Sequence, residues 1–229
     1  MKQSTYLKIT DYLKEFATEE RWNTITEVAN RRTRHITLVI EDIYQPHNAS
    51  AVLRSCDGFG IQDVHIIENA NEFDASSQVT IGADQWLSIH RYNKESENNT
   101  TICLESLRKQ GYQIIATSPH ENDSDLNDLN IDHKTALVFG NEMEGISETV
   151  KEKADGFVRI PMAGFSESYN ISVSAAICLY DVTLRLRNSG INWQLSDDEL
   201  VRLHYEWLKR SIKAGEELEK QWFKNNPDL

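Results

Sequence analysis

A stretch near the C-terminal end of the chain carries polar residues in an order that suits a small polar ligand. A strand is expected to end at Ile160, before Pro161, and a helix is expected to begin near Asn170. The loop between them holds Ser168 and Tyr169. A loop that joins a strand to a helix N-terminus presents backbone N–H and C=O groups to such ligands. The pattern is general, because N-capping of the helix by Ser168 or Asn170 would explain the same residues.

A second loop, residues 140–145 with the sequence GNEMEG, follows an apolar run at 135–139. Its two glycines, Gly140 and Gly145, allow a ligand to approach the backbone closely, or serve only a tight turn. The segment is not G-x-G-x-x-G, and no acidic residue follows it at the spacing of dinucleotide-binding sites. The sequence therefore disfavours a Rossmann cofactor site.

A third segment, residues 45–60, reads QPHNASAVLRSCDGFG and places an amide and a guanidinium on one expected helix. As plain structure, Asn48 would be the helix N-cap and Arg54 an exposed helix residue. As chemistry, Arg54 could serve as a general base only in an environment that removes its proton, since arginine is almost always protonated. It could instead stabilise developing negative charge. The Asn-x5-Arg spacing alone decides nothing.

In their order and spacing along the chain, the three segments closely resemble the motifs of the TrmH (SpoU) branch of the SPOUT RNA methyltransferases. The resemblance spans about residues 36–187. It implies an α/β fold with a mostly parallel sheet covered by helices. It also implies that the C-terminal segment is threaded into a trefoil knot, which pattern reasoning would not propose because knots are rare. The implied activity is methyl transfer from S-adenosylmethionine to a ribose 2′-hydroxyl of RNA, without a metal ion.

The resemblance also implies roles for individual residues. Arg54 would act at the ribose hydroxyl, Asn48 would hold the site together, and Glu142 would position its groups. Ser168 and Asn170 match the family's polar pair before the helix. The implied cofactor-binding residues are Thr117, Gly140, Asn141, Gly145, Ile160, Met162 and Tyr169. Most relatives have leucine in place of Tyr169, which alters the pocket only if the contact is made by the side chain.

Finer details of the first motif and the ends of the chain narrow the implied substrate. PHNxSA at 46–51 and DxxGxxxVH at 57–65, with helical extensions on both ends of the chain, are similar to the tRNA enzymes of the family. These methylate the guanosine at position 18 of the D-loop, so the implied function is tRNA guanosine 2′-O-methylation. Two alternatives stay open. One is a ribosomal-RNA 2′-O-methyltransferase, and the other is an RNA-binding or assembly factor that has lost catalysis.

Alternating strands and helices must position these motifs. A strand at 36–40, a helix at 47–59 and a strand at 64–67 form a β–α–β unit. Further strands are expected at 86–92, 112–117, 135–139 and 157–160, and further helices at 98–110, 147–153 and 170–187. The acidic segment 120–133 is expected to be a loop. Such alternation predicts a mostly parallel sheet with helices on both faces.

Amphipathic patterns flank this alternation on both sides. Residues 3–31 predict two short helices, and Ser196 caps a long helical region that reaches about Lys224. We therefore expect a helical N-terminal extension at 1–35, a methyltransferase domain at 36–187 and a helical C-terminal extension at 188–229. The resemblance implies a homodimer formed through helix 170–187, whose small residues permit close packing: Ser172, Ser174, Ala175 and Ala176.

The charge balance argues against a nucleic-acid partner. The net charge is −12, whereas binding a polyanion normally draws on a basic surface. Arg31, Arg32 and Arg34 form a local basic cluster that predicts contact with tRNA phosphates. A solvated helix end that favours cations explains the cluster about as well.

The composition is that of an ordinary globular protein, with 39% hydrophobic and 26% charged residues. No apolar run approaches membrane-spanning length and no signal peptide is visible, so no membrane partner is expected. The cysteines, Cys56, Cys103 and Cys178, are widely spaced and lack a CxxC pair. They predict packed, reduced thiols in a cytoplasmic protein. The histidines show no ligand spacing, which disfavours a metal site.

Overall fold

The computed structural model describes residues 1–73, 80, 82–118 and 124–227, and the chain divides into two compact units. One unit runs from Thr33 to Trp193 and contains all three motifs. The other combines Met1–Arg32 with Gln194–Leu229, so the segments from both ends of the chain share one unit.

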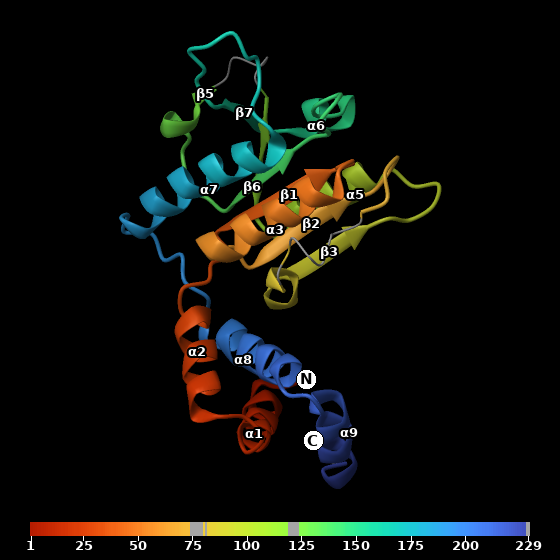
Figure 1. Ribbon diagram of the computed structural model, residues 1–229, viewed down its shortest axis with the longest axis vertical. Helices are drawn as coiled ribbons and strands as arrows, with labels where there is room; N and C mark the ends of the chain where they lie inside the picture. Colours follow the sequence, from red (N-terminus) through yellow and green to blue (C-terminus); the bar gives the residue numbers. More distant parts are fainter. Residues whose placement is uncertain (74–79, 81, 119–123, 228–229) are drawn as a thin grey trace. The chain divides into compact units, whose positions relative to one another are not determined.

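The unit from Thr33 to Trp193 is built on a seven-stranded sheet with the order β3-β2-β1-β6-β4-β7-β5 (Figure 1). All neighbouring strands pair in parallel. The predicted α/β class with a mostly parallel sheet is confirmed. In chain order the strands are β1 (Ile36–Glu41), β2 (Asp63–Ile67), β3 (Ser88–Tyr92), β4 (Gln113–Thr117), β5 (Ser124–Asp125), β6 (Thr135–Phe139) and β7 (Gly156–Arg159).

Helices cover both faces of this sheet. Helices α3 (Pro46–Phe59) and α7 (Ile171–Arg187) contribute to one buried cluster, and α5 (Asn99–Lys109) and α6 (Glu148–Lys153) to the other. Along β1, Leu38 belongs to the first cluster and Val39 to the second. Because both faces of the sheet centre are covered, the central strands β1 and β6 are almost entirely apolar, whereas the edge strand β3 carries polar residues.

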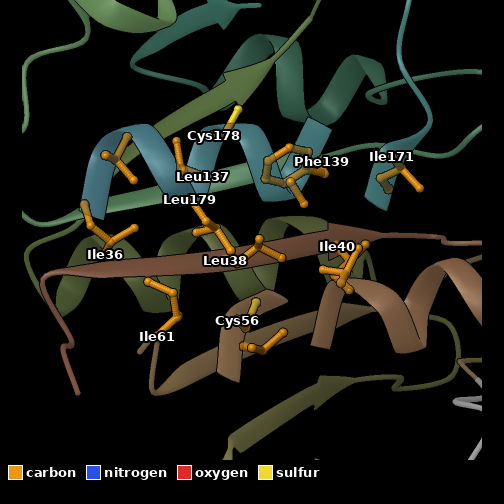
Figure 2. Packing of buried hydrophobic residues seen from close by; sticks show 14 of the residues in the cluster. Ile36, Leu38, Ile40, Cys56, Ile61, Leu137, Phe139, Ile171, Cys178 and Leu179 are labelled. Carbon is orange, nitrogen blue, oxygen red and sulfur yellow. The ribbon is translucent and has the colours of Figure 1, made fainter. Parts of the chain in front are cut away.

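The cluster between the sheet and helices α3 and α7 fixes how the motif-bearing segments lie (Figure 2). Leu38 of β1 and Leu137 of β6 are register partners, and both are fully buried. They lie in the same cluster as Cys56 of α3 and Leu179 of α7. Burying one such aliphatic side chain contributes roughly 1.5–3 kcal/mol. This packing holds α3 and α7 in register with the ends of the central strands.

Several local expectations differ from the structure. Asn48 is not the N-cap of α3, because Gln45 takes that position and Pro46 occupies the first helical turn, where its missing N–H costs nothing. The strand expected at 86–92 begins at Ser88, since residues 83–86 form a 3₁₀ turn. Within the acidic segment expected to be a loop, residues 124–125 form β5 and residues 126–128 a second 3₁₀ turn. Residues 120–123 of that segment lie outside the described residues.

The other unit consists of α1 (Gln3–Lys14), α2 (Glu19–Ala29), α8 (Asp197–Ser211) and α9 (Gly215–Asn225). Ser196 caps α8 as expected, and Glu199 completes a capping box with it. The single long helix expected to follow it is wrong. Ile212 is extended (φ −96°, ψ 128°), and a Cβ on Gly215 would lie 2.0 Å from the carbonyl oxygen of Lys209. The chain therefore turns here, between two separate helices.

Among the described residues, no helix is long and apolar enough to cross a membrane. No group of three His, Cys, Asp or Glu side chains in the same part of the chain could hold a metal ion. Cys56, Cys103 and Cys178 are free and buried, as the sequence predicted. The trefoil knot and the three-part division of the chain stay predictions.

Candidate functional site

A cavity of about 500 Å³ opens at the carboxyl ends of neighbouring strands β4, β6 and β7. Thr117, Phe139 and Val158, from the ends of these three strands, line it. Ligands of parallel α/β sheets bind at this edge, and the volume is within the range of small-molecule sites. All the residues expected to bind a cofactor line this cavity: Thr117, Gly140, Asn141, Gly145, Ile160, Met162 and Tyr169.

The loop after β6 forms one wall of the cavity, and its glycines have different functions. Asn141 and Gly145 exchange two backbone hydrogen bonds, of 2.8 and 2.9 Å, which close the loop. A Cβ on Gly140 would lie 2.2 Å from the carbonyl carbon of Gly145, so only glycine fits there. Gly145 itself has a φ of 73°. The two glycines thus form a tight turn, and the same turn lines the cavity.

The Asn141 side chain shapes this loop from within. Its Oδ1 accepts a hydrogen bond from the N–H of Met143 at 2.7 Å. Its Nδ2 donates to the carbonyl oxygen of Asp42 at 2.7 Å, which ties the loop after β6 to the loop after β1. The side-chain amide of Asn141 thus shapes the loop after β6 and links it to the loop after β1.

Glu142 connects the first two motifs. Its Oε1 accepts from Asn48 Nδ2 at 2.9 Å and from the N–H of Gln45 at 3.2 Å. Its Oε2 accepts from the N–H of Tyr44 at 2.9 Å. Partial burial alone would raise the pKa of this carboxyl, but the donors from Asn48, Tyr44 and Gln45 outweigh burial and hold the pKa below its usual value. Glu142 is therefore a fixed negative charge at neutral pH.

Asn170 joins the third motif to this group. Its Nδ2 donates to Asn48 Oδ1 at 3.1 Å, while its Oδ1 accepts from the N–H of Ser172 at 2.9 Å and caps α7. N-capping and participation in the site are thus both true of this residue. Glu142, Asn48 and Asn170 form a chain of hydrogen bonds along the cavity wall, and Ser168 also lines the cavity.

Arg54 is placed apart from these residues. It is exposed on α3 and is not among the residues that line the cavity. It lies six residues after Asn48, which is about 9 Å along the helix axis and about a third of a turn around it. The structure thus brings together all the predicted catalytic residues except the guanidinium.

The predicted RNA-binding arginines have different environments. Arg31 is exposed and pairs with Glu27 one turn earlier on α2. Arg32 is 1% exposed and lies over the ring of Trp207, 5.0 Å from its centroid. Arg34 pairs with Asp63, with 2.9 Å between Nε and Oδ2. Of the three, Arg31 is the one whose side chain extends into solvent, and phosphate contact by the group stays a prediction.

Sequence reasoning missed residues that organise the cavity edge. Asp42 adopts a left-handed φ of 49°, and its Oδ1 accepts from the N–H groups of Asn69, Ala70 and Asn71. Buried Glu41 accepts from the hydroxyls of Thr100 and Ser147. Aspartate tolerates the left-handed region, but the sequence carries no other signal for this role.

A second cavity of about 560 Å³ adjoins the first and shares Arg159, Ile160, Met162 and Glu167 with it. Residues of the loop between β7 and α7 form much of its lining, with Asp125 of β5 on another side. Arg159 Nε donates to Asp125 Oδ1 at 2.6 Å. No motif of the sequence includes Asp125, Arg159 or Glu167 as a site residue.

Comparisons with known proteins give consistent results. Residues 35–180 match the profile of the SpoU rRNA Methylase family. The chain is 39% identical to the tRNA (guanosine(18)-2′-O)-methyltransferase of Borreliella burgdorferi, over 90% of this chain and 93% of that protein. The corresponding enzyme of Thermus thermophilus is 29% identical, over 84% and 98% of the two chains. The crystal structure of the A. aeolicus TrmH/SpoU tRNA modifying enzyme matches with a TM-score of 0.75 and 26% identity, covering 85% of this chain and 98% of that one.

Proposed function

Because this chain belongs to the SpoU rRNA Methylase family, as its three motifs predicted, we propose that it is an S-adenosylmethionine-dependent tRNA 2′-O-methyltransferase. The proposed target is the ribose of guanosine 18 in the D-loop. The 39% identity to a relative of that name, over nine-tenths of both chains, supports this substrate. The observation that carries the proposal is the cavity at the carboxyl ends of β4, β6 and β7, where the three motifs meet.

The cavity suits the proposed cofactor. Residues of the loops after β6 and β7 line it, and its polar and apolar lining fits a ligand with both an adenine and an amino-acid part. Three carboxylates, Glu142, Glu144 and Glu167, and two cations, Lys151 and Arg159, line it, so its net charge of −1 is compatible with a sulfonium. When bound, S-adenosylmethionine supplies an activated methyl group, so the protein needs to align the ribose oxygen with it and to help remove the hydroxyl proton.

The chain of Glu142, Asn48 and Asn170 would serve as a rigid wall for this alignment. Each member has its polar atoms engaged by a neighbour, so none must reorganise when the ribose arrives. Ser168 extends the wall toward the cavity with an exposed hydroxyl. This is the positioning role that the resemblance implied for these residues.

The exposed position of Arg54 supports a homodimer as the active form. Val173, Tyr180 and Leu184 are exposed and recur on one face of α7, a pattern that favours burial against a second copy. The ring of Tyr180 contacts Phe59 of α3, the helix that carries Arg54. A second copy seated on this surface would cover α3 and α7 together, and would bring the guanidinium of one protomer close to the partner's cavity.

The proposal is tested with labelled S-adenosylmethionine and three substrates: total tRNA, ribosomal RNA, and a tRNA with deoxyguanosine at position 18. We expect label in total tRNA and none in the deoxy tRNA, since the accepting hydroxyl is absent. Label in ribosomal RNA alone would identify the alternative substrate. No label in any RNA would contradict the enzyme and leave an RNA-binding factor.

Arg54 is tested by the variants Arg54→Ala and Arg54→Lys. We expect Arg54→Ala to lower the methylation rate on the order of 100-fold or more, the usual cost of removing one stabilising donor. Partial activity of Arg54→Lys at all pH values would identify electrostatic stabilisation, whereas a rate that climbs as the ammonium loses its proton would identify a base. Cofactor affinity is the control and should not change. Full activity of both variants would remove Arg54 from the mechanism.

A further inference from the structure

The second cavity has a composition that suits one nucleobase. We propose that it is the pocket for the target base, and that Glu167 selects guanine there while Phe165 provides a stacking surface. This inference rests on the proposed function and names the residues that recognise its substrate. Glu167 lines both cavities, so a ligand held by it lies next to the site of methyl transfer.

The charges in this cavity leave one carboxylate available to a ligand. Asp125 is held by Arg159, whose Nε donates to it at 2.6 Å. Glu167 is exposed, and within the part of the chain that the structure describes no group donates a hydrogen bond to it. Asp125 and Arg159 therefore neutralise each other, while Glu167 offers two acceptor oxygens to a ligand.

Two adjacent acceptor oxygens match guanine and no other common base. The Watson–Crick edge of guanine presents the N1–H and the N2 amino group side by side, and a carboxylate can accept from both. Adenine has an acceptor at N1, which would face the carboxylate unfavourably. Uracil offers one donor between two carbonyl oxygens, and cytosine one donor beside an acceptor. Glu167 thus discriminates by pairing with guanine and by repelling its competitors.

Phe165 supplies the apolar surface that such a base would require. Its side chain is fully exposed (109%) and is not part of the cavity lining, but its chain neighbours Gly164 and Ser166 both line the second cavity. Proteins that read unpaired RNA bases stack them on exposed aromatic rings and hydrogen-bond their edges. A phenylalanine left in solvent beside a polar cavity has this arrangement.

The position of the cavity agrees with the geometry of the reaction. The ribose must reach the first cavity while its base remains attached, so the base must occupy space that adjoins it. The two cavities share four residues: Arg159, Ile160, Met162 and Glu167. A nucleotide with its base in the second cavity would therefore present its ribose toward the first.

The test separates base recognition from methyl transfer. Binding of GMP, IMP and AMP to the full chain is measured by saturation-transfer NMR, in the presence of S-adenosylhomocysteine. We expect GMP to bind best, IMP more weakly because it lacks the 2-amino group, and AMP least. Glu167→Gln should reduce GMP affinity on the order of 10- to 100-fold and leave AMP nearly unchanged. The matched control is Glu152→Gln, at an exposed position of α6, and it should leave all three affinities unchanged.

The aromatic residue has its own pair of variants. Phe165→Ala should weaken all three nucleotides by a similar factor, on the order of 10-fold, while Phe165→Tyr should retain binding. Equal binding of GMP and AMP, or an unchanged GMP affinity in Glu167→Gln, would overturn the base pocket. An effect of Phe165→Ala on oligomeric state and none on nucleotides would assign that ring to a protein interface and also overturn its stacking role.

Methylation assays then distinguish this inference from the proposed function. With tRNA transcripts that carry G, inosine or A at position 18, the ratio of kcat/KM for G over A should collapse in Glu167→Gln. A guanine-selective cavity without methyl transfer to any RNA would contradict the proposed function and leave the base pocket standing. Methyl transfer that ignores the base, in the wild type and in Glu167→Gln alike, would retain the function and remove the pocket.

Discussion

At the scale of single residues, Glu142 ties the loop after β6 to the segment at the start of α3. The Glu142 carboxylate accepts hydrogen bonds from three N–H groups. Glu142→Gln would remove its charge and would place an NH2 donor opposite at least one of these donors. We expect a loss of about 1–3 kcal/mol in the free energy of unfolding, measured by urea titration at pH 7, together with slower methyl transfer. Glu144→Gln, on the same loop, should change the unfolding free energy by less than about 0.5 kcal/mol. Equal stability of the two variants would contradict this role.

The lowered pKa of Glu142 gives this contribution a pH dependence. A carboxyl whose folded pKa is depressed stabilises the protein above its unfolded pKa, and the stabilisation is lost as pH falls through the folded value. Acidification through the lowered pKa of Glu142 should therefore loosen the cavity wall, because this carboxyl then becomes protonated.

His65, on β2, predicts a second and separate pH dependence. It is 3% exposed, stacks on His90 and shares a hydrogen bond with Tyr92. Burial, and then the charge of His90, lower its pKa to about 4, while Asp63 opposes them. Since the unfolded chain takes up this proton at a higher pH than the folded chain, stability should fall as pH drops from about 6.5 to about 4.

The variant His65→Gln tests this expectation. Wild-type protein should lose up to about 3 kcal/mol across that pH window from this group, and the variant should show a shallower slope. Urea unfolding at pH 7 and pH 5 measures the difference. His133→Gln, at an exposed position, should leave the slope unchanged. Parallel slopes for wild type and His65→Gln would refute the assignment.

At the scale of elements, the loop after β6 depends on close backbone contact. Gly140→Ala would place a Cβ 2.2 Å from the backbone of Gly145, so the loop must open. We expect a loss of cofactor affinity of 10-fold or more and a destabilisation of about 1–3 kcal/mol. Gly58→Ala is the matched control, because nothing lies within 4 Å of its Cβ and alanine favours the interior of α3. That variant should be more stable by up to about 1 kcal/mol. Calorimetric titration and thermal unfolding measure both effects.

The elements that the sequence predicted correctly are those with strong local signals. The strands at 36–40 and 135–139 are compact, largely apolar runs, and Ser196 caps its helix as expected. The helices expected from 98 and 147 are also present, with Asn98 and Ser147 as their N-caps. The helix break at residues 212–214 depends on the contact between Gly215 and Lys209, which no local pattern reveals. The two-residue strand β5 exists because it pairs with β7, so a segment rich in acidic residues gave no sign of it.

The candidate site shows the same division between local and tertiary information. All the residues predicted to bind the cofactor line the first cavity. They could be predicted because loops at strand ends carry recognisable glycine and amide patterns. The motifs did not reveal Asp42, whose function arises from three amides of a segment 27–29 residues away. The sequence also gave no sign that Arg32 is buried or that Arg34 pairs with Asp63, because both are tertiary outcomes.

At the scale of the whole molecule, the exposed apolar face of α7 predicts self-association. The double variant Tyr180→Glu and Leu184→Glu places charges on that face and should convert the proposed dimer into monomers, with methyl transfer lost in parallel. Leu7→Glu, at an exposed apolar position on α1, is the control and should not change the mass. Sedimentation equilibrium measures the result. A wild-type protein that is monomeric at micromolar concentration would exclude the proposed interface.

The carboxylate of Asp42 has a further consequence for hydrogen exchange. The amides of Asn69, Ala70 and Asn71 donate to its single oxygen at 2.7, 2.8 and 3.2 Å, although they follow β2 in a segment without helix or strand. In heavy water these three sites should retain protons far longer than a loop would suggest. They should also lose protection together when Asp42→Ala removes the acceptor. The edge of the sheet that faces the ligand would then behave as one cooperative unit, opening and closing as a whole.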